Sequence, residues 1–232
     1  MRSQSVRPML LALACVCAMA CVQVGQQQVQ PWRLFSLTPL PEPEAEKVAS
    51  TRSPGPVQGG IGVGPVHLPG YLDQDQIVTR ISQNRFTLSD DNRWAEPLED
   101  NIGRVLAQNL SMLLHNDQVS LNRWPVGQRP VYQLEIDVLG FETDTAGTAH
   151  LAARWLLHDV ASRQTIAEMD TRLTSSAAGG STEQSVASLS QALGDFSVEI
   201  AKAIRETAEH CLPQSGTGRQ ETGLQPSGPP RP

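Results

Sequence analysis

The stretch "VYQLEIDVL" at residues 131–139 alternates apolar and polar side chains with a period of two. Its apolar face carries Tyr132, Leu134, Ile136 and Val138. Its polar face carries Gln133, Glu135 and Asp137. The stretch "LAARWLL" at residues 151–157 repeats the pattern, with Leu151, Ala153, Trp155 and Leu157 on one face. A period of two with one polar face is typical of an antiparallel sheet that packs on a core from one side, so we predict such a sheet here.

Shorter strands are expected on the N-terminal side of this pair. The stretch "GIGVGPVHL" at residues 60–68 has the composition of a strand. The stretches "QIVTRIS" (76–82) and "RFTLSD" (85–90) are separated by the two residues Gln83-Asn84. A two-residue connection between apolar runs predicts a hairpin.

Two stretches follow helical spacing instead. One apolar stripe begins after Pro97 and consists of Leu98, Ile102, Val105, Leu106, Leu110 and Leu113. A second consists of Val186, Leu189, Leu193, Phe196, Ile200 and Ile204. Ser181 and Gln184 precede the second stripe at the spacing of a capping box. Strands, helix, strands and helix in this order predict an α+β fold, in which two helices pack on one face of a mainly antiparallel sheet in a single domain.

The N-terminus has the three-part layout of a secretory signal. Arg2 and Arg7 precede an apolar run from Met9 to Ala20, and three of the four cysteines fall in "ACVCAMAC" at residues 14–21. The run is about a dozen residues long, whereas a membrane-spanning helix needs roughly 20. We therefore predict that residues 1–20 are a signal peptide that is removed, and a retained transmembrane anchor is the weaker interpretation.

Residues 18–21, "AMAC", resemble the lipobox of bacterial lipoproteins, in which a Cys after small residues is acylated and becomes the mature N-terminus. Cys15 also follows Leu-Ala and is a rival acceptor. Choosing Cys15 would shorten the apolar region to about six residues, below the usual minimum of about 7. We therefore predict lipid attachment at Cys21. Each buried CH₂ of an acyl chain contributes about 0.8 kcal/mol to membrane binding.

Composition divides the mature chain into three parts. Residues 21–31 form a Gln-rich tether, residues 32–210 form the folded domain, and residues 211–232 form a Pro/Gly-rich tail with the composition of disordered chain. Within the domain, residues 41–60 are polar and rich in Pro and Gly, which predicts a long loop. After cleavage only Cys211 remains as a thiol, so no intramolecular disulfide is expected.

The sequence shows no recognisable catalytic set. Net charge is −6, which argues against nucleic acid as a partner. None of the five histidines is paired with another at helical spacing, and no HExxH, paired-Cys or G-x-S-x-G motif occurs. We therefore predict no enzymatic activity, no cofactor and no metal.

Several stretches together resemble the ABC-type transport auxiliary lipoprotein family, which includes the auxiliary lipoproteins of the paraquat-inducible transport system. They are residues 62–80, 84–114, "FE" (141–142), "ARWLL" (153–157) and 188–204. The most specific blocks are "LPGYLD" at residues 68–73 and "RWAEPL" at residues 93–98.

The resemblance implies a non-enzymatic subunit of a Gram-negative system that moves lipids between the inner and outer membranes. Its implied partners are a periplasmic protein with mammalian-cell-entry (MCE) domains and, through it, an inner-membrane permease. Asp beside the lipidated Cys is the familiar signal for inner-membrane retention, so Val22 favours the outer membrane, facing the periplasm. Two alternatives stay open: an outer-membrane assembly or structural lipoprotein without an MCE partner, and a periplasmic enzyme with an unfamiliar site. Self-association into a homo-oligomer is also open.

Partner-binding residues are expected in and near the "LPGYLD" block. The candidates are Leu68, Pro69, Tyr71, Leu72, Arg80 and Trp94. Tyr and Arg are enriched among residues that dominate binding energy at interfaces. In the alternative interpretation Tyr71 and Leu72 cover the edge of the sheet, and Trp94 packs on the helix that follows it.

Overall fold

A computed structural model describes residues 31–50, 57, 59–121, 129–177 and 180–211. The chain divides into two compact units, Met1–Arg33 and Leu34–Pro232, and the folded domain belongs to the second. The predictions for the signal peptide, for Cys15 and Cys21, for residues 21–30 of the tether and for the tail from residue 212 onward lie outside the described residues.

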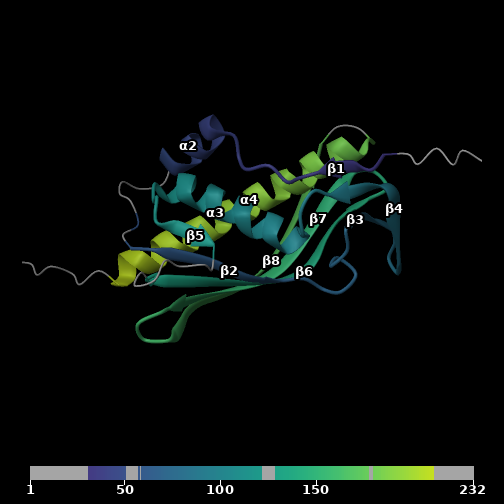
Figure 1. Cartoon of the computed structure of the whole chain (residues 1–232). Helices are drawn as coiled ribbons and strands as arrows, with labels where there is room; N and C mark the ends of the chain where they lie inside the picture. Colours follow the sequence, from purple (N-terminus) through teal and green to yellow (C-terminus); the bar gives the residue numbers. More distant parts are fainter. Residues whose placement is uncertain (1–30, 51–56, 58, 122–128, 178–179, 212–232) are drawn as a thin grey trace, which may run out of the picture. The chain divides into compact units, whose positions relative to one another are not determined.

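The described chain contains strands and helices in the order expected of an α+β domain (Figure 1). The strands are β1 (Arg33–Phe35), β2 (Ile61–His67), β3 (Gln76–Ser82), β4 (Arg85–Trp94), β5 (Val119–Leu121), β6 (Tyr132–Asp144), β7 (Thr148–Asp159) and β8 (Gln164–Ser176). The helices are α2 (Glu42–Ser50), α3 (Leu98–Leu114) and α4 (Thr182–Cys211). The predicted strands, the hairpin and the two long helices are therefore confirmed.

The eight strands form one sheet. Its hydrogen-bonded order is β1-β4-β3-β6-β2-β5, and β7 and β8 extend it from β6. The pairs β3–β4, β6–β7 and β7–β8 are antiparallel, which confirms the predicted antiparallel character. β2 pairs in parallel with both β5 and β6, and β3 pairs in parallel with β6. Parallel neighbours need long crossover connections, and α3 supplies the crossover between β2 and β5.

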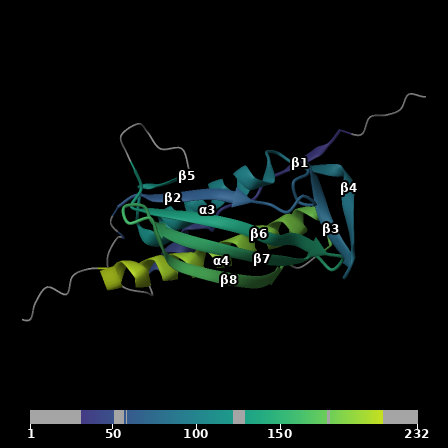
Figure 2. The same ribbon diagram turned by 90° about the horizontal axis from the view of Figure 1, so that it is seen from below.

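The helices α3 and α4 cover one face of the sheet (Figure 1). Figure 2 views the opposite face, with β6, β7 and β8 side by side in front of α4. The apolar residues predicted from the alternation in β6 and β7 are all buried, and Trp155 and Phe196 are among the largest buried side chains. Burying a large apolar side chain contributes about 1.5–3 kcal/mol, so this layer supplies much of the stability.

The predicted capping box closes the start of α4. The Ser181 backbone N–H donates to Gln184 Oε1 at 3.0 Å, and the Gln184 backbone N–H donates to Ser181 Oγ at 3.3 Å. The other long helix, α3, ends at His115. Its φ of 49° is left-handed, and its N–H donates to the carbonyl of Met112. Both helices thus begin close to the residues that the sequence indicates.

The prediction of a loop over residues 41–60 is wrong for its first half, which forms α2. The carbonyl of Pro41 accepts hydrogen bonds from the N–H groups of Glu44 and Ala45 and so starts the helix. Pro43 is tolerated because the first helical turn leaves its N–H groups without intrahelical partners. Ala45 and Ala49, four residues apart, are both buried, so packing of one small apolar face stabilises the helix. The polar composition of the segment had suggested a loop instead.

Candidate functional site

The six residues that were predicted to bind a partner lie in different environments. Leu68, Pro69 and Tyr71 are half-buried in the loop between β2 and β3. Leu72 is only 1% exposed and Trp94 only 7%, and both belong to the hydrophobic core. The sixth, Arg80 on β3, keeps 32% of its side chain exposed. Partner binding by these residues stays a prediction, and the half-buried members are the ones whose surfaces a partner could reach.

A buried carboxylate brings Tyr71 and Arg80 together. Glu142 on β6 has a side chain that is 1% exposed. Its Oε2 accepts a hydrogen bond from the Tyr71 hydroxyl at 2.8 Å, and its Oε1 accepts one from Arg80 Nε at 2.9 Å and a second from Arg80 Nη2. The backbone N–H of Phe141 also donates to Oε2 at 2.9 Å. Every oxygen of the carboxylate is therefore bonded, as a buried charge requires.

Phe86 on β4 completes this cluster from the hairpin. Its ring stacks on that of Tyr71 with 4.6 Å between the centroids and 26° between the planes. The Arg80 guanidinium lies 4.4 Å from the centroid of the same ring, within the range of a cation–π interaction. Burial, followed by the hydrogen bond to Glu142, raises the pKa of Tyr71 well above its ordinary value. The phenol therefore stays neutral and remains a hydrogen-bond donor at physiological pH.

A β-bulge in β6 explains why Glu142 was missed as a site residue. Val138 pairs with Ala153, but Gly140 pairs with Ala152, so the register shifts by one residue between them. The shift turns Phe141 toward the core and Glu142 toward the opposite face, where Tyr71 and Arg80 cover it. An isolated Gly in a strand pattern is the sequence signal of such a bulge, and Gly140 could have indicated it.

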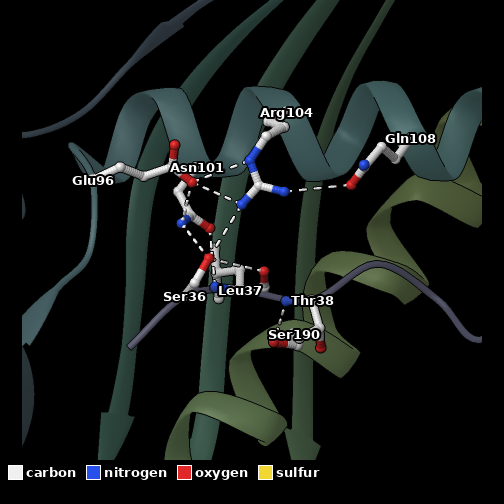
Figure 3. Close-up of polar contacts among 8 residues, drawn as sticks. All are labelled: Ser36, Leu37, Thr38, Glu96, Asn101, Arg104, Gln108 and Ser190. Atoms are coloured by element: carbon white, nitrogen blue, oxygen red, sulfur yellow. Dashed lines mark hydrogen bonds and ion pairs between the residues drawn. The ribbon is translucent and has the colours of Figure 1, made fainter. Parts of the chain in front are cut away.

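A second polar arrangement holds the segment of residues 36–40, which we call the strap. The strap passes between α3 and α4, and Figure 3 shows three of its residues with their partners. The backbone N–H of Leu37 donates to Asn101 Oδ1 at 3.0 Å, that of Thr38 to Ser190 Oγ at 3.1 Å, and that of Leu40 to Asn109 Oδ1 at 2.8 Å. Helix side chains thus replace the strand partner that this extended segment lacks.

Packing of apolar side chains also holds the strap in place. The side chains of Leu37 and Leu40 are 2% and 6% exposed. A Cβ at Gly194 would lie 2.5 Å from Leu40 Cδ2, so α4 can approach the strap closely only with Gly at that position. Asn101 and Asn109 are completely buried on the apolar face of α3. The sequence signal for these contacts with the strap was the presence of two asparagines on an apolar stripe, and the sequence prediction did not use it.

Replacing Asn109 with Ala is expected to lower the free energy of unfolding by about 2 kcal/mol, because the buried N–H of Leu40 loses its acceptor. Urea denaturation measures the change. Gln108→Ala is the matched control on the same helix, since Gln108 is exposed, and it should change stability by less than about 0.5 kcal/mol. Equal effects of the two substitutions would show that the strap is not clamped by Asn109.

No helix in the part of the chain that the structure describes is both long enough and apolar enough to cross a membrane.

The fold is similar to that of two solved structures. One is an uncharacterised protein with 22% sequence identity and a TM-score of 0.59, and the match covers 75% of this chain and 99% of that one. The other comes from Xanthomonas campestris and is assigned to DUF330, with 18% identity, a TM-score of 0.61, and coverage of 77% of this chain and 97% of that one. At these identities the likeness shows the fold alone.

The chain matches none of the curated proteins with which it was compared. The family model of the ABC-type transport auxiliary lipoprotein component matches residues 39–201. The match runs from the strap through most of α4. It therefore includes the cluster of Tyr71, Arg80 and Glu142, and the residues of α3 and α4 that bind the strap. It also confirms the family resemblance that the sequence blocks predicted. The chain therefore belongs to the family of ABC-type transport auxiliary lipoprotein components.

Proposed function

We propose that this protein is a non-enzymatic lipoprotein subunit of a Gram-negative envelope lipid-transport system, in which it docks a periplasmic MCE-domain protein to the outer membrane. The observation that carries the proposal is the family match over residues 39–201. Lipid on Cys21 holds the chain to the membrane, and the docked partner connects it to an inner-membrane permease. The domain acts as a rigid adaptor between the two.

The strap supports the adaptor role. It begins five residues after the predicted tether (21–31) ends. Three backbone hydrogen bonds and two buried leucines join it to α3 and α4. In this proposal a pull on the tether is passed through the strap to α3 and α4.

The proposed docking surface is the loop surface, which we define as Leu68, Pro69, Gly70 and Tyr71. Tyr71 is held by its stacking on Phe86 and by its hydrogen bond to Glu142. A preorganised aromatic side chain loses little freedom on binding, which favours it as an anchor for a partner. Gly70 is exposed beside it, and a Cβ there would meet no atom within 4 Å.

Gly70→Arg is expected to weaken binding of the MCE-domain partner by about tenfold or more without changing the melting temperature. A long charged side chain fits the open space in the free protein but obstructs a docked partner, and burying it there would carry a desolvation cost. The measurement is the affinity of the mature lipoprotein in detergent for the purified MCE-domain protein of the same transport system.

Gly180→Arg is the matched control. Gly180 lies in the turn before α4 and is also exposed, and a Cβ there would likewise meet no atom within 4 Å. Its affinity should equal that of the wild type. Wild-type affinity in Gly70→Arg would exclude the loop surface as the docking site. Failure of the wild type itself to bind would favour the alternative of an assembly or structural lipoprotein without an MCE partner.

A further inference from the structure

A histidine and two carboxylates lie together on the sheet. In the alternation of β6 the two carboxylates fall on the face opposite the buried residues, and Figure 2 views the face of the sheet that α3 and α4 leave uncovered. His67 ends β2, and Glu135 and Asp137 lie on β6 with their side chains half-buried. One ligand atom from each of the three side chains lies within 4.8 Å of the other two. His67 pairs with Asp137 in the register of the two strands, so the backbone of a sheet holds the group together.

A second histidine lies beside the central carboxylate. Glu135 Oε1 lies 3.9 Å from His67 Nε2, and Glu135 Oε2 lies 3.5 Å from His158 Nε2 on β7. His158 Nδ1 in turn lies 3.1 Å from the hydroxyl of Thr165 on β8. Residues around a metal site commonly position the side chains that bind the metal, and His158 is close enough to Glu135 to take this role.

The neighbouring arginine, Arg154, forms its hydrogen bonds with Asp170. Arg154 Nε donates to Asp170 Oδ1 at 2.9 Å, and Arg154 Nη2 donates to Asp170 Oδ2 at 3.2 Å. This bidentate geometry is the preferred one for arginine and a carboxylate. Arg154 also lies opposite Asp137 in the register of β6 and β7 and interacts with it electrostatically. Glu135 and Asp137 thus place two carboxylates beside the imidazole of His67, and Arg154 on the neighbouring strand offsets part of their charge.

We propose that His67, Glu135 and Asp137 form a binding site for a divalent transition metal, with Zn²⁺ as the best fit. An imidazole with carboxylates suits Zn²⁺, whereas Ca²⁺ and Mg²⁺ prefer oxygen ligands alone. Bonds of about 2.0–2.2 Å in a tetrahedral site bring ligand atoms to about 3.3 Å from one another. His67 Nε2 and Glu135 Oε1 are 3.9 Å apart, and these side chains, 57% and 37% exposed, need only small rotations to close that distance.

The proposed metal would join the C-terminal end of β2 to β6. β5 pairs with Ile61–Val63, so within the described residues the second half of β2 has β6 as its only strand partner. The β2–β6 register is irregular between Val63 and Val66. Three protein ligands leave a fourth position for water, as in an open zinc site. The site stands on its own residues and does not depend on the proposed docking role.

Isothermal titration of the metal-free mature lipoprotein in detergent with Zn²⁺ is the test. We expect saturable binding of one Zn²⁺ per chain. His67→Ala and Asp137→Asn should each weaken the affinity by about tenfold or more, as should His158→Ala through loss of the orienting contact. The melting temperatures of all three variants in EDTA should equal that of the wild type, because the substituted side chains are on the surface of the sheet.

Two control variants separate this site from other zinc ligands. His150 Nε2 lies 3.3 Å from Asp144 Oδ2 and offers a similar pair of one imidazole and one carboxylate without a third ligand, so His150→Ala should bind Zn²⁺ like the wild type. Cys211→Ser should also bind like the wild type, although a thiolate is a strong zinc ligand. The proposal is overturned if the wild type binds no Zn²⁺ saturably, or if either control loses affinity while His67→Ala keeps it.

Discussion

Arg80→Met is expected to lower the free energy of unfolding by about 3 kcal/mol, because it leaves the carboxylate of Glu142 buried without a counter-charge. Breaking a buried ion pair by removing one partner costs about 3–5 kcal/mol. The lower end applies here, since water reaches the 32% of the Arg80 side chain that is exposed. The cation–π contact with Phe86 is lost as well. Urea denaturation of the wild type and the variant measures the difference.

Arg154→Met is the matched control for this experiment. Arg154 and Asp170 also join two neighbouring strands through an arginine–carboxylate pair, but about half of each side chain is exposed. Exposed pairs contribute little, so this variant should unfold at nearly the wild-type urea concentration. A similar loss of unfolding free energy in both variants would show that burial of Glu142 does not increase the cost of removing its arginine partner.

A double variant separates the buried charge from simple loss of packing. Arg80→Met with Glu142→Leu removes both charges and keeps apolar volume, and replacing a buried pair in this way is often nearly neutral. The double variant should therefore be more stable than Arg80→Met alone. If the double variant is instead less stable than the single one, the unpaired carboxylate does not account for the loss, and packing or the hydrogen bonds from Tyr71 and the Phe141 N–H to Glu142 matter more.

Cys21→Ser is expected to abolish incorporation of a palmitate analogue and to release the protein from the membrane fraction. The predicted acceptor supplies the thiol to which lipid is attached, and a hydroxyl at the same position is not expected to replace it. Two or more acyl chains are needed for stable anchoring, so a chain without lipid should be lost from the membrane fraction completely. Metabolic labelling followed by fractionation of the envelope measures both effects.

Cys15→Ser is the control that tests the choice of acceptor. Cys15 lies within the predicted signal peptide, so its replacement should leave labelling unchanged. Labelling that persists in Cys21→Ser and disappears in Cys15→Ser would show that Cys15, and not Cys21, carries the lipid. Because both residues lie outside the described part of the chain, this chemistry is tested only by experiment.

Local patterns in the sequence were enough to predict most of the secondary structure. The period of two in residues 131–139 and 151–157 predicted two strands and the faces that are buried in them. The two apolar stripes predicted α3 and α4, and Ser181 with Gln184 predicted the cap of α4. These features depend on residues that are two to four positions apart, and side-chain periodicity reports directly on such distances. The family blocks were likewise readable from the sequence, as the match over residues 39–201 shows.

Tertiary structure alone decided which distant residues meet. Arg80 and Glu142 are 62 residues apart, and Leu40 and Asn109 are 69 apart. The bulge between Val138 and Gly140 reverses the faces that follow it, and only pairing with β7 reveals the reversal. α2 forms because Ala45 and Ala49 are buried, although its own composition is that of a loop. His67 reaches Glu135 and Asp137 through the parallel pairing of β2 with β6. Local periodicity identifies which face of an element is buried, whereas the partner on that face is set by strand register and packing over the whole chain.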